Sequence, residues 1–324
     1  MDIHKEAYKE LDKIRTSNQK IKEKRTLEVY KKIPQIQKID QEISQIGIKI
    51  TKAALSTEKD IPSMIHLLKL EIDKLKKQKF DLLSKEYSSN YLDLQYSCIL
   101  CEDTGNINQK RCSCINKIIT DKYLEISGTR LLLERENFST FNLNYYSNEK
   151  NIPGTNFTER SYMNAILNQT KLFCENFGKK YENILFSGDP GRGKTFLCNC
   201  IAKALTDDGH IVFYSTANRL SKNIESSRFD KDQEARNLLK LYYNAPLLIL
   251  DDLGSEFSTA ATDPEIFNII NTRILYQKPT IISTNLDSKA MEIQYSQRIV
   301  SRLFGEYKTF KIISSDIRIL KQEF

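Results

Sequence analysis

The sequence predicts an α/β fold in which helices flank a parallel sheet of five strands, preceded by a helical N-terminal region. A glycine-rich motif stands between a short apolar run and a helical stretch, within residues 183–205. Four further apolar runs follow it, with helical stretches between them. Strands that alternate with helices form a doubly wound sheet, which binds its ligands at the carboxyl ends of the strands. The first 90 residues instead show apolar side chains at spacings of three and four, which is typical of amphipathic helices.

The glycine-rich motif matches the phosphate-binding pattern G-x-x-x-x-G-K-[ST] through Gly188, Gly193, Lys194 and Thr195. Glycines allow backbone N–H groups to surround a phosphate, and the helix that follows directs its positive end at the same anion. The lysine reaches the β- and γ-phosphates, and the threonine hydroxyl is placed for Mg²⁺. An ordinary glycine turn is the alternative, but a strand before the motif and a helix after it favour a nucleotide site.

A second motif closes the apolar run at 247–252, which ends with Asp251 and Asp252 in a Walker B pattern. A fully apolar strand is buried on both faces, as in a parallel sheet. At its carboxyl end the first acid can hold Mg²⁺ through water, and the second can polarise an attacking water. Buried structural carboxylates are the alternative. The remaining strands are predicted at 211–216, 280–285 and 309–313.

The two motifs together predict a site for ATP or ADP with Mg²⁺. The residues expected to bind the nucleotide are Gly188, Asp189, Pro190, Gly191, Arg192, Gly193, Lys194, Thr195, Phe196 and Asp251. Two of them, Thr195 and Asp251, are expected to hold the Mg²⁺ ion.

The N-terminal region is predicted to be helical. Residues 2–32 are charged and contain few helix breakers, and Pro34 then starts a new helix, because proline is tolerated in a first turn. Apolar side chains recur at helical spacing over 36–50 and over 61–82, with Lys79 interrupting the second stripe. These helices form either a self-contained bundle or a docking surface for a larger protein.

Charge is distributed unevenly along the chain of 324 residues, which has a net charge of +7. Residues 1–90 hold 20 Lys and Arg against 14 Asp and Glu, whereas the rest holds 29 against 28. A basic region suits an acidic partner or nucleic acid, and a solvated helix face is the alternative. The sequence contains neither a run of 18 apolar residues nor a signal peptide, so we expect a cytoplasmic protein without a membrane partner.

Four of the seven cysteines lie within 17 residues, as Cys98, Cys101, Cys112 and Cys114. In a cytosolic chain such a cluster indicates metal ligands rather than disulfides, and four thiolates suit a tetrahedral Zn²⁺ ion. The turn-forming residues 103–105 follow the first pair, and little apolar sequence is available for a core, so the metal would hold this module together. A redox dithiol is the alternative for the first pair.

Here the chain resembles the AAA+ family, and more closely the bacterial replicative helicase loaders of the DnaC/DnaI type, over roughly residues 96–318. The motifs that carry the resemblance lie at 188–195, 247–256, 283–285 and 298–303, together with the cysteine cluster and residues 103–105. The resemblance implies an AAA+ domain with little or no C-terminal lid. The regions expected are a basic helical segment at 1–90, a zinc module at 91–135, a linker at 136–158 and an ATPase domain at 159–324.

The resemblance also implies roles near the γ-phosphate. Asp252 would orient the attacking water, although many AAA+ proteins carry a glutamate there, and Glu256 is a substitute candidate. Asn285 would be the first sensor. Arg302 resembles the arginine finger that reaches the ATP of a neighbouring subunit, with Arg298 one turn earlier as an alternative. Arg318 resembles the second sensor. Surface salt bridges are the alternative for each arginine.

The family's function implies three partners: the hexameric replicative helicase through the N-terminal region, single-stranded DNA, and further copies of the chain through the AAA+ domain. The expected DNA segment is 217–245, with Arg219, Lys222, Arg228, Phe229, Lys231 and Tyr242 as candidate contacts. The implied activity is ATP-dependent loading of the helicase onto DNA at replication initiation or restart, by an ATPase that is weak until partners stimulate it. A transposase-associated AAA+ ATPase and a non-hydrolysing ATP-binding adaptor are the alternatives.

Overall fold

The computed structural model describes residues 3–54, 61–128, 130–228, 233–257, 259 and 261–320. It divides into two compact units. The smaller comprises residues 9–104, and the larger comprises 105–324 with the first residues of the chain, up to Tyr8. None of the described helices is both long and apolar enough to cross a lipid bilayer.

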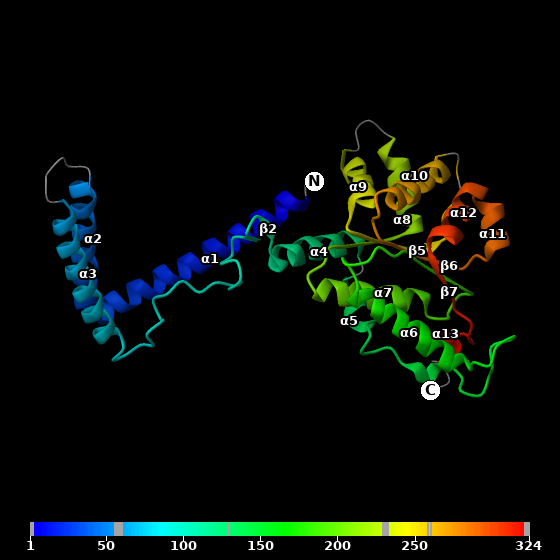
Figure 1. Ribbon diagram of the computed structural model, residues 1–324, viewed down its shortest axis with the longest axis horizontal. Helices are drawn as coiled ribbons and strands as arrows, with labels where there is room; N and C mark the ends of the chain where they lie inside the picture. The colour runs from blue at the N-terminus through cyan, green and yellow to red at the C-terminus, as the bar shows by residue number, and fades with distance from the viewer. Residues whose placement is uncertain are drawn as a thin grey trace. The chain divides into compact units, whose positions relative to one another are not determined.

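The smaller unit contains the three N-terminal helices that the sequence predicts. They are α1 Ile3–Lys32, whose first residues belong to the larger unit, α2 Pro34–Ala54 and α3 Ile61–Leu83. Helices α2 and α3 lie side by side (Figure 1). Lys79, which interrupts the apolar stripe of α3, donates to Asp40 of α2 at 2.6 Å, and the Tyr30 hydroxyl donates to the same carboxylate. The lysine that interrupts the apolar stripe therefore forms an ion pair that links α3 to α2.

The larger unit is built on five strands, which confirm the predicted ones within a few residues. They are β3 Ile184–Ser187, β4 Val212–Thr216, β5 Leu247–Leu253, β6 Thr280–Thr284 and β7 Lys308–Lys311. All pairs are parallel, in the order β4-β5-β6-β3-β7. The phosphate-loop strand β3 and the Walker B strand β5 are therefore separated by β6, and the carboxyl ends of all three lie at one edge of the sheet.

Helices cover both faces of this sheet. The helices of the P-loop domain are α6 Glu159–Glu175, α7 Lys194–Asp207, α8 Ala217–Ser227, α9 Gln233–Asn244, α10 Thr262–Leu275, α11 Ser288–Gln294, α12 Gln297–Glu306 and α13 Ile317–Leu320. Figure 1 shows α6 and α7 on one face and α8, α9 and α10 on the other. Leu185, Ile249 and Ile281 are completely buried between the layers, which confirms the doubly wound arrangement.

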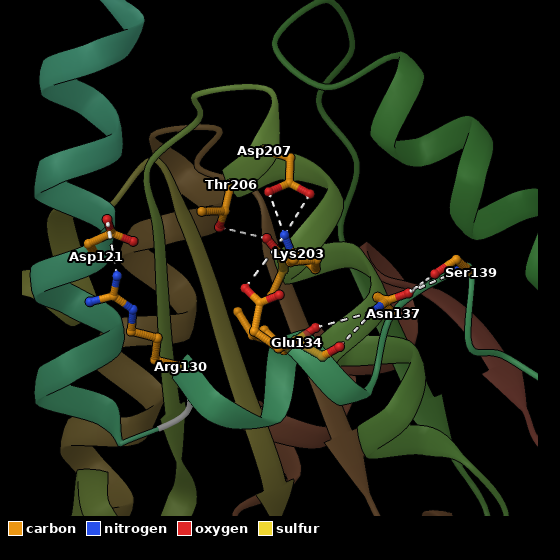
Figure 2. Close-up of polar contacts among 10 residues, drawn as sticks. Asp121, Arg130, Glu134, Asn137, Ser139, Lys203, Thr206 and Asp207 are labelled. Atoms are coloured by element: carbon orange, nitrogen blue, oxygen red, sulfur yellow. Dashed lines mark hydrogen bonds and ion pairs between the residues drawn. The ribbon is translucent and has the colours of Figure 1, made fainter. Parts of the chain in front are cut away.

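A short segment precedes the P-loop domain. It contains β1 Asn106–Ile107, β2 Lys110–Arg111, α4 Ser113–Ser127, α5 Arg130–Arg135 and the 3₁₀ helix η1 Leu143–Tyr145. Helix α5 lies along α7. The Nζ atom of Lys203 on α7 is 3.7 Å from Glu134 Oε1 on α5 and 2.7 Å from Asp207 Oδ1 on its own helix (Figure 2). Asn137 then turns the chain, because its side chain accepts from the Ser139 amide and donates to the Glu134 carbonyl. This turn directs the following residues toward the phosphate loop.

Candidate nucleotide-binding site

The phosphate loop needs its glycines for space as well as for backbone conformation. Gly188, Gly191 and Gly193 all have positive φ angles. A Cβ on Gly188 would lie 2.4 Å from the Ile312 carbonyl oxygen, and one on Gly191 would lie 2.0 Å from the Asp316 carboxylate. At Gly188 a side chain is excluded by the backbone of Ile312, whereas at Gly191 the Asp316 side chain would have to move, and both positions carry the strain of a positive φ.

Lys194 lies at the start of α7 and is 6% exposed. Its Nζ donates to the carbonyl oxygens of Gly188 and Asp189, each at 2.7 Å. Burial lowers the pKa of this ammonium group to about 8, and the nearby carboxylates of Asp252 and Asp251 partly oppose that shift. The loop thus satisfies its lysine with its own carbonyls, and phosphate oxygens would be stronger, charged acceptors for the same three donor hydrogens.

The two Walker B acids both line the cavity because β5 is irregular at this point. The pairing of β5 with β6 shifts between Leu250 and Leu253, and Asp252 has a φ of 60°. Consecutive side chains of a regular strand point to opposite faces, whereas a bulge can redirect one of them. Here the irregularity brings Asp251 and Asp252 to the same cavity.

Hydroxyl groups from three elements hold Asp251. Thr195 of α7 donates at 3.1 Å, the Tyr214 hydroxyl of β4 donates at 2.9 Å, and Ser283 of β6 donates to the same carboxylate. Asp251 is 5% exposed, so these donors replace the water that a carboxylate would otherwise bind. Thr195 and Asp251, the two residues expected to hold Mg²⁺, are therefore in direct contact.

Asp252 and Asn285 are also in contact. The Asn285 side-chain nitrogen donates to Asp252 at 2.5 Å, and the Asp252 amide donates to Ser283 Oγ at 2.8 Å. Both residues line the cavity. Glu256, the substitute candidate for orienting water, points elsewhere: its carboxylate accepts from the Gly254 amide and from the Tyr295 hydroxyl. The structure therefore does not support Glu256 as a group that contacts water at the γ-phosphate.

The cavity has a volume of about 670 Å³, which is within the usual range for a bound small molecule. Part of the cavity wall comes from residues that precede α6, and all of these except Arg135 fall in the segment 136–158 that was predicted to be a linker. The residues of this wall are Arg135, Glu136, Thr140, Phe141, Asn142, Tyr145 and Tyr146. Phe141 stacks on Tyr146 and meets Phe196 edge to face, and the Tyr146 hydroxyl donates to the Arg192 carbonyl. The concentration of aromatic residues in this polar stretch was the signal that could have identified them.

Two of the predicted arginines, Arg298 and Arg302, are not among the described residues that line this cavity. Arg298 and Arg302 lie one turn apart on α12, and both are exposed, while Ile299 and Leu303 of the same helix are buried. Arg318 falls in α13, but its side chain lies outside the described residues. Neighbouring Ile317 lines the cavity. The roles of these arginines stay predictions.

The expected DNA segment forms α8 and α9. Lys222 and Arg228 are exposed on or next to α8, and Arg219 is half-buried. Tyr242 was expected to stack on DNA bases, and this expectation is wrong. Its side chain is completely buried, with its ring edge to face with Phe213 and its hydroxyl bonded to Ser215 and Asn223. Phe229 and Lys231 lie outside the described residues.

The four clustered cysteines follow one another within residues 98–114. Their sulfur atoms are all within 4.8 Å of one another. Tetrahedral Zn²⁺ with bonds of about 2.3 Å separates its sulfur ligands by about 3.8 Å, so the donor set fits zinc. The buried Asp103 orients the first pair by accepting from the amides of Ser97 and Cys98. The tight turn after that pair has positive φ at Glu102 and Asp103.

Comparison with known proteins agrees with this geometry. The family model of IstB-like ATP-binding proteins matches residues 134–298, which is just over half of the chain. The uncharacterized protein YdaV of Escherichia coli K12 is 27% identical over 199 residues, covering 60% of this chain and 74% of YdaV. The replicative helicase loader DnaC of Buchnera aphidicola subsp. Baizongia pistaciae is 28% identical over 135 residues, and that of E. coli K12 is 26% identical over 141 residues. These matches cover 41% and 44% of this chain, and 55% and 57% of the two DnaC proteins.

Similar solved structures include DnaI, at 23% identity and a TM-score of 0.45, covering 58% of this chain and 93% of DnaI. The DnaC helicase loader matches at 25% identity with the same TM-score, covering 56% of this chain and 99% of that one. On the family match over residues 134–298, the chain belongs to the IstB-like family of ATP-binding proteins.

Proposed function

We propose that this protein is an ATP-dependent loader of the replicative DNA helicase onto single-stranded DNA, with ATP binding and hydrolysis as its switch. The observation that carries the ATPase part is the convergence of Lys194, Asp252 and Asn285 on one cavity. The loader part is supported by the similarity to proteins named replicative helicase loader DnaC, which extends over 41–45% of this chain. These matches span 55 to 59% of the length of those relatives.

Within the proposal, five residues at the cavity have defined tasks. Lys194 exchanges its two loop carbonyls for phosphate oxygens, which are charged acceptors. Thr195 and Asp251 would hold Mg²⁺, which supplies neutralisation of the phosphate charge when it is bound. Asp252 accepts a hydrogen bond from the attacking water, and Asn285 fixes the Asp252 carboxylate for that purpose.

The three proposed partners use different surfaces. The basic helices of the smaller unit, with the zinc module, bind the helicase. The basic side chains of α8, Arg219, Lys222 and Arg228, neutralise the backbone of single-stranded DNA. The exposed face of α12 supplies Arg302, or Arg298 one turn away, to the nucleotide of a neighbouring copy.

The test is a pull-down from host lysate with ATP, followed by phosphate release from the purified protein with and without single-stranded DNA and the captured helicase. We expect the hexameric helicase to be recovered with the wild-type chain, and phosphate release to exceed that of a Lys194→Ala control. Recovery of a transposase instead of the helicase would point to the transposase-associated ATPase. Phosphate release no higher than the Lys194→Ala control under every condition would make the protein a non-hydrolysing adaptor.

A further inference from the structure

The turn that follows the Walker B strand is tied to the start of α12 by a buried pair, Glu256 and Tyr295. The two side chains are only 5% and 4% exposed. One carboxylate oxygen of Glu256 accepts from the Gly254 amide at 2.9 Å, and the other accepts from the Tyr295 hydroxyl. Beside this pair, the Gln294 side chain donates to the Gly254 carbonyl at 3.2 Å. Two side-chain links therefore join residues 254–256 to the junction between α11 and α12.

A carboxylate in this position is poorly suited to stability alone. Taking it out of water is costly, and its hydrogen bonds roughly offset that cost rather than exceed it. Burial, together with Glu256, raises the pKa of Tyr295, so its hydroxyl stays protonated and acts as the donor. Such a pair contributes a fixed geometry. If the two side chains separate, a buried carboxylate and a buried hydroxyl each lose a hydrogen bond, which is costly in free energy.

On its other side, the same turn is fixed to the nucleotide cavity. Gly254 has a φ of 101°, and a Cβ there would lie 2.4 Å from the Leu286 side chain. The Thr284 hydroxyl donates to the Leu253 carbonyl at 2.7 Å. The neighbouring Asp252 accepts from Asn285 inside the cavity. Residues 252–256 therefore contact the cavity at one end and the α11–α12 junction at the other.

The helix reached by this connection carries the two exposed arginines. Tyr295 lies just before α12 and is held by burial, and Ile299 and Leu303 fix the inner face of that helix. Arg298 and Arg302 project from the exposed side of the helix. A shift of the α11–α12 junction would therefore move both guanidinium groups as one body.

We propose that Glu256 and Tyr295 are positioning residues, which hold the arginines of α12 in a fixed relation to the Asp252–Asn285 pair of the same subunit. The proposal rests on the proposed function, in which an α12 arginine acts on the nucleotide of a neighbouring copy. In each subunit, the α12 arginine is then positioned for the neighbouring copy only when the cavity of that subunit holds the turn at 252–256 in place. Glu256 influences hydrolysis in the next subunit rather than water in its own.

The first variant is Tyr295→Phe, which deletes one oxygen and keeps the ring. We expect its affinity for a fluorescent ATP analogue to stay within about twofold of wild type, since the cavity residues are untouched. The turnover number should fall by about 10- to 100-fold, because displacement of a reacting group by about 1 Å costs that much. The matched control is Tyr243→Phe, which removes another tyrosine–carboxylate bond, to Glu265, and should leave turnover unchanged. Melting temperatures of both variants are measured alongside.

The deciding experiment mixes Tyr295→Phe with Lys194→Ala protein. The first has an intact cavity and a displaced arginine. The second lacks the ammonium group expected to bind phosphate, but it keeps the Asp252–Asn285 and Glu256–Tyr295 contacts that place its arginine. In a 1:1 mixture, random head-to-tail assembly gives about a quarter of the wild-type rate per protomer, well above either variant alone. Absence of recovery, or loss of nucleotide affinity in Tyr295→Phe, overturns the positioning role.

Failure of the proposed function itself is visible in the wild type. If wild-type phosphate release per protomer stays constant over a wide range of protein concentration, the neighbour-dependent mechanism fails, and the positioning role fails with it. If the wild type does depend on concentration but the mixture shows no recovery, only the role of Glu256 and Tyr295 is overturned.

Discussion

The nucleotide cavity and the four-cysteine module are organised in opposite ways. In the cavity, side chains from α7, β4, β5 and β6 are already bonded to one another: Asp251 accepts from three hydroxyl groups, and Asp252 accepts from Asn285. In the module, all four ligands come from 17 consecutive residues, and the apolar side chains of Ile99 and Leu100 are 85% and 71% exposed.

The difference identifies what stabilises each site. The cavity is arranged by the buried strands of a large domain, so the ligand finds its donors in place. The module has no comparable burial at Ile99 and Leu100, and the binding of a metal ion by its four sulfur atoms would supply free energy for its folding. We therefore expect loss of the ligand to leave the cavity folded but to disorder the module.

Removal of zinc has the largest expected effect, because structural zinc sites contribute about 10 to 16 kcal/mol of apparent binding free energy. We expect the purified protein to contain one zinc per chain, and a Cys98→Ser, Cys101→Ser double variant to contain none. Hydrogen exchange of the amides between Ser97 and Cys112 should accelerate strongly, while those of β5 and β6 stay protected. A zinc content of zero in the wild type, or a module that stays protected in the variant, would show that the chain alone holds it.

Lys194→Ala should cause the next largest effect, and it acts on the nucleotide cavity rather than on the cysteine module. It removes the ammonium group that donates to the loop carbonyls, so affinity for ATP should fall by about 100- to 1000-fold, as for loss of a charge-assisted contact to phosphate. The fold should survive, since the cavity is arranged by other side chains. Titration of a fluorescent nucleotide, with circular dichroism as the control, measures both. Binding within threefold of wild type would place the nucleotide elsewhere.

The features predictable from the sequence are those whose signal is local. The phosphate loop, the Walker B acids and the five strands each lie within a few consecutive residues, and the structure has strands in all five places. The helices over 3–32, 34–54 and 61–83 followed from spacing and one proline for the same reason. The cysteine cluster is also local, which is why its four sulfur atoms could be expected to meet.

The features that were missed depend on the tertiary arrangement. Tyr242 is aromatic in a basic segment, but only the packing of α9 against the sheet shows that its ring is buried. Glu256 follows the Walker B acids closely, yet its partner Tyr295 is 39 residues further along the chain. The wall formed by Phe141 and Tyr146 depends on the turn at Asn137, which points a polar linker toward the phosphate loop.

Arg273→Met tests whether buried contacts stabilise the sheet on which the nucleotide cavity is built. Arg273 is completely buried and donates to the carbonyls of Tyr242, Ala245 and Pro279 and to the Thr280 hydroxyl. Burial lowers its pKa to about 10. The variant would leave several buried carbonyls without a donor, so we expect a loss of about 3 to 5 kcal/mol in unfolding free energy. Urea denaturation measures it, and a loss below about 1 kcal/mol would mean that water replaces the guanidinium.

Arg130→Ala has the smallest expected effect and uses the same residue type in the opposite environment. Arg130 lies at the start of α5, and its side chain is 53% exposed. It pairs with Asp121 at 3.8 Å (Figure 2) and with Glu125 at 3.0 Å. Water and salt screen both pairs, so the variant should lose no more than about 0.5 kcal/mol. Its urea midpoint is compared with that of Arg273→Met at low and at high salt. A loss approaching that of Arg273→Met, removed by high salt, would mean that this surface network rather than burial sets the position of α5 against α4.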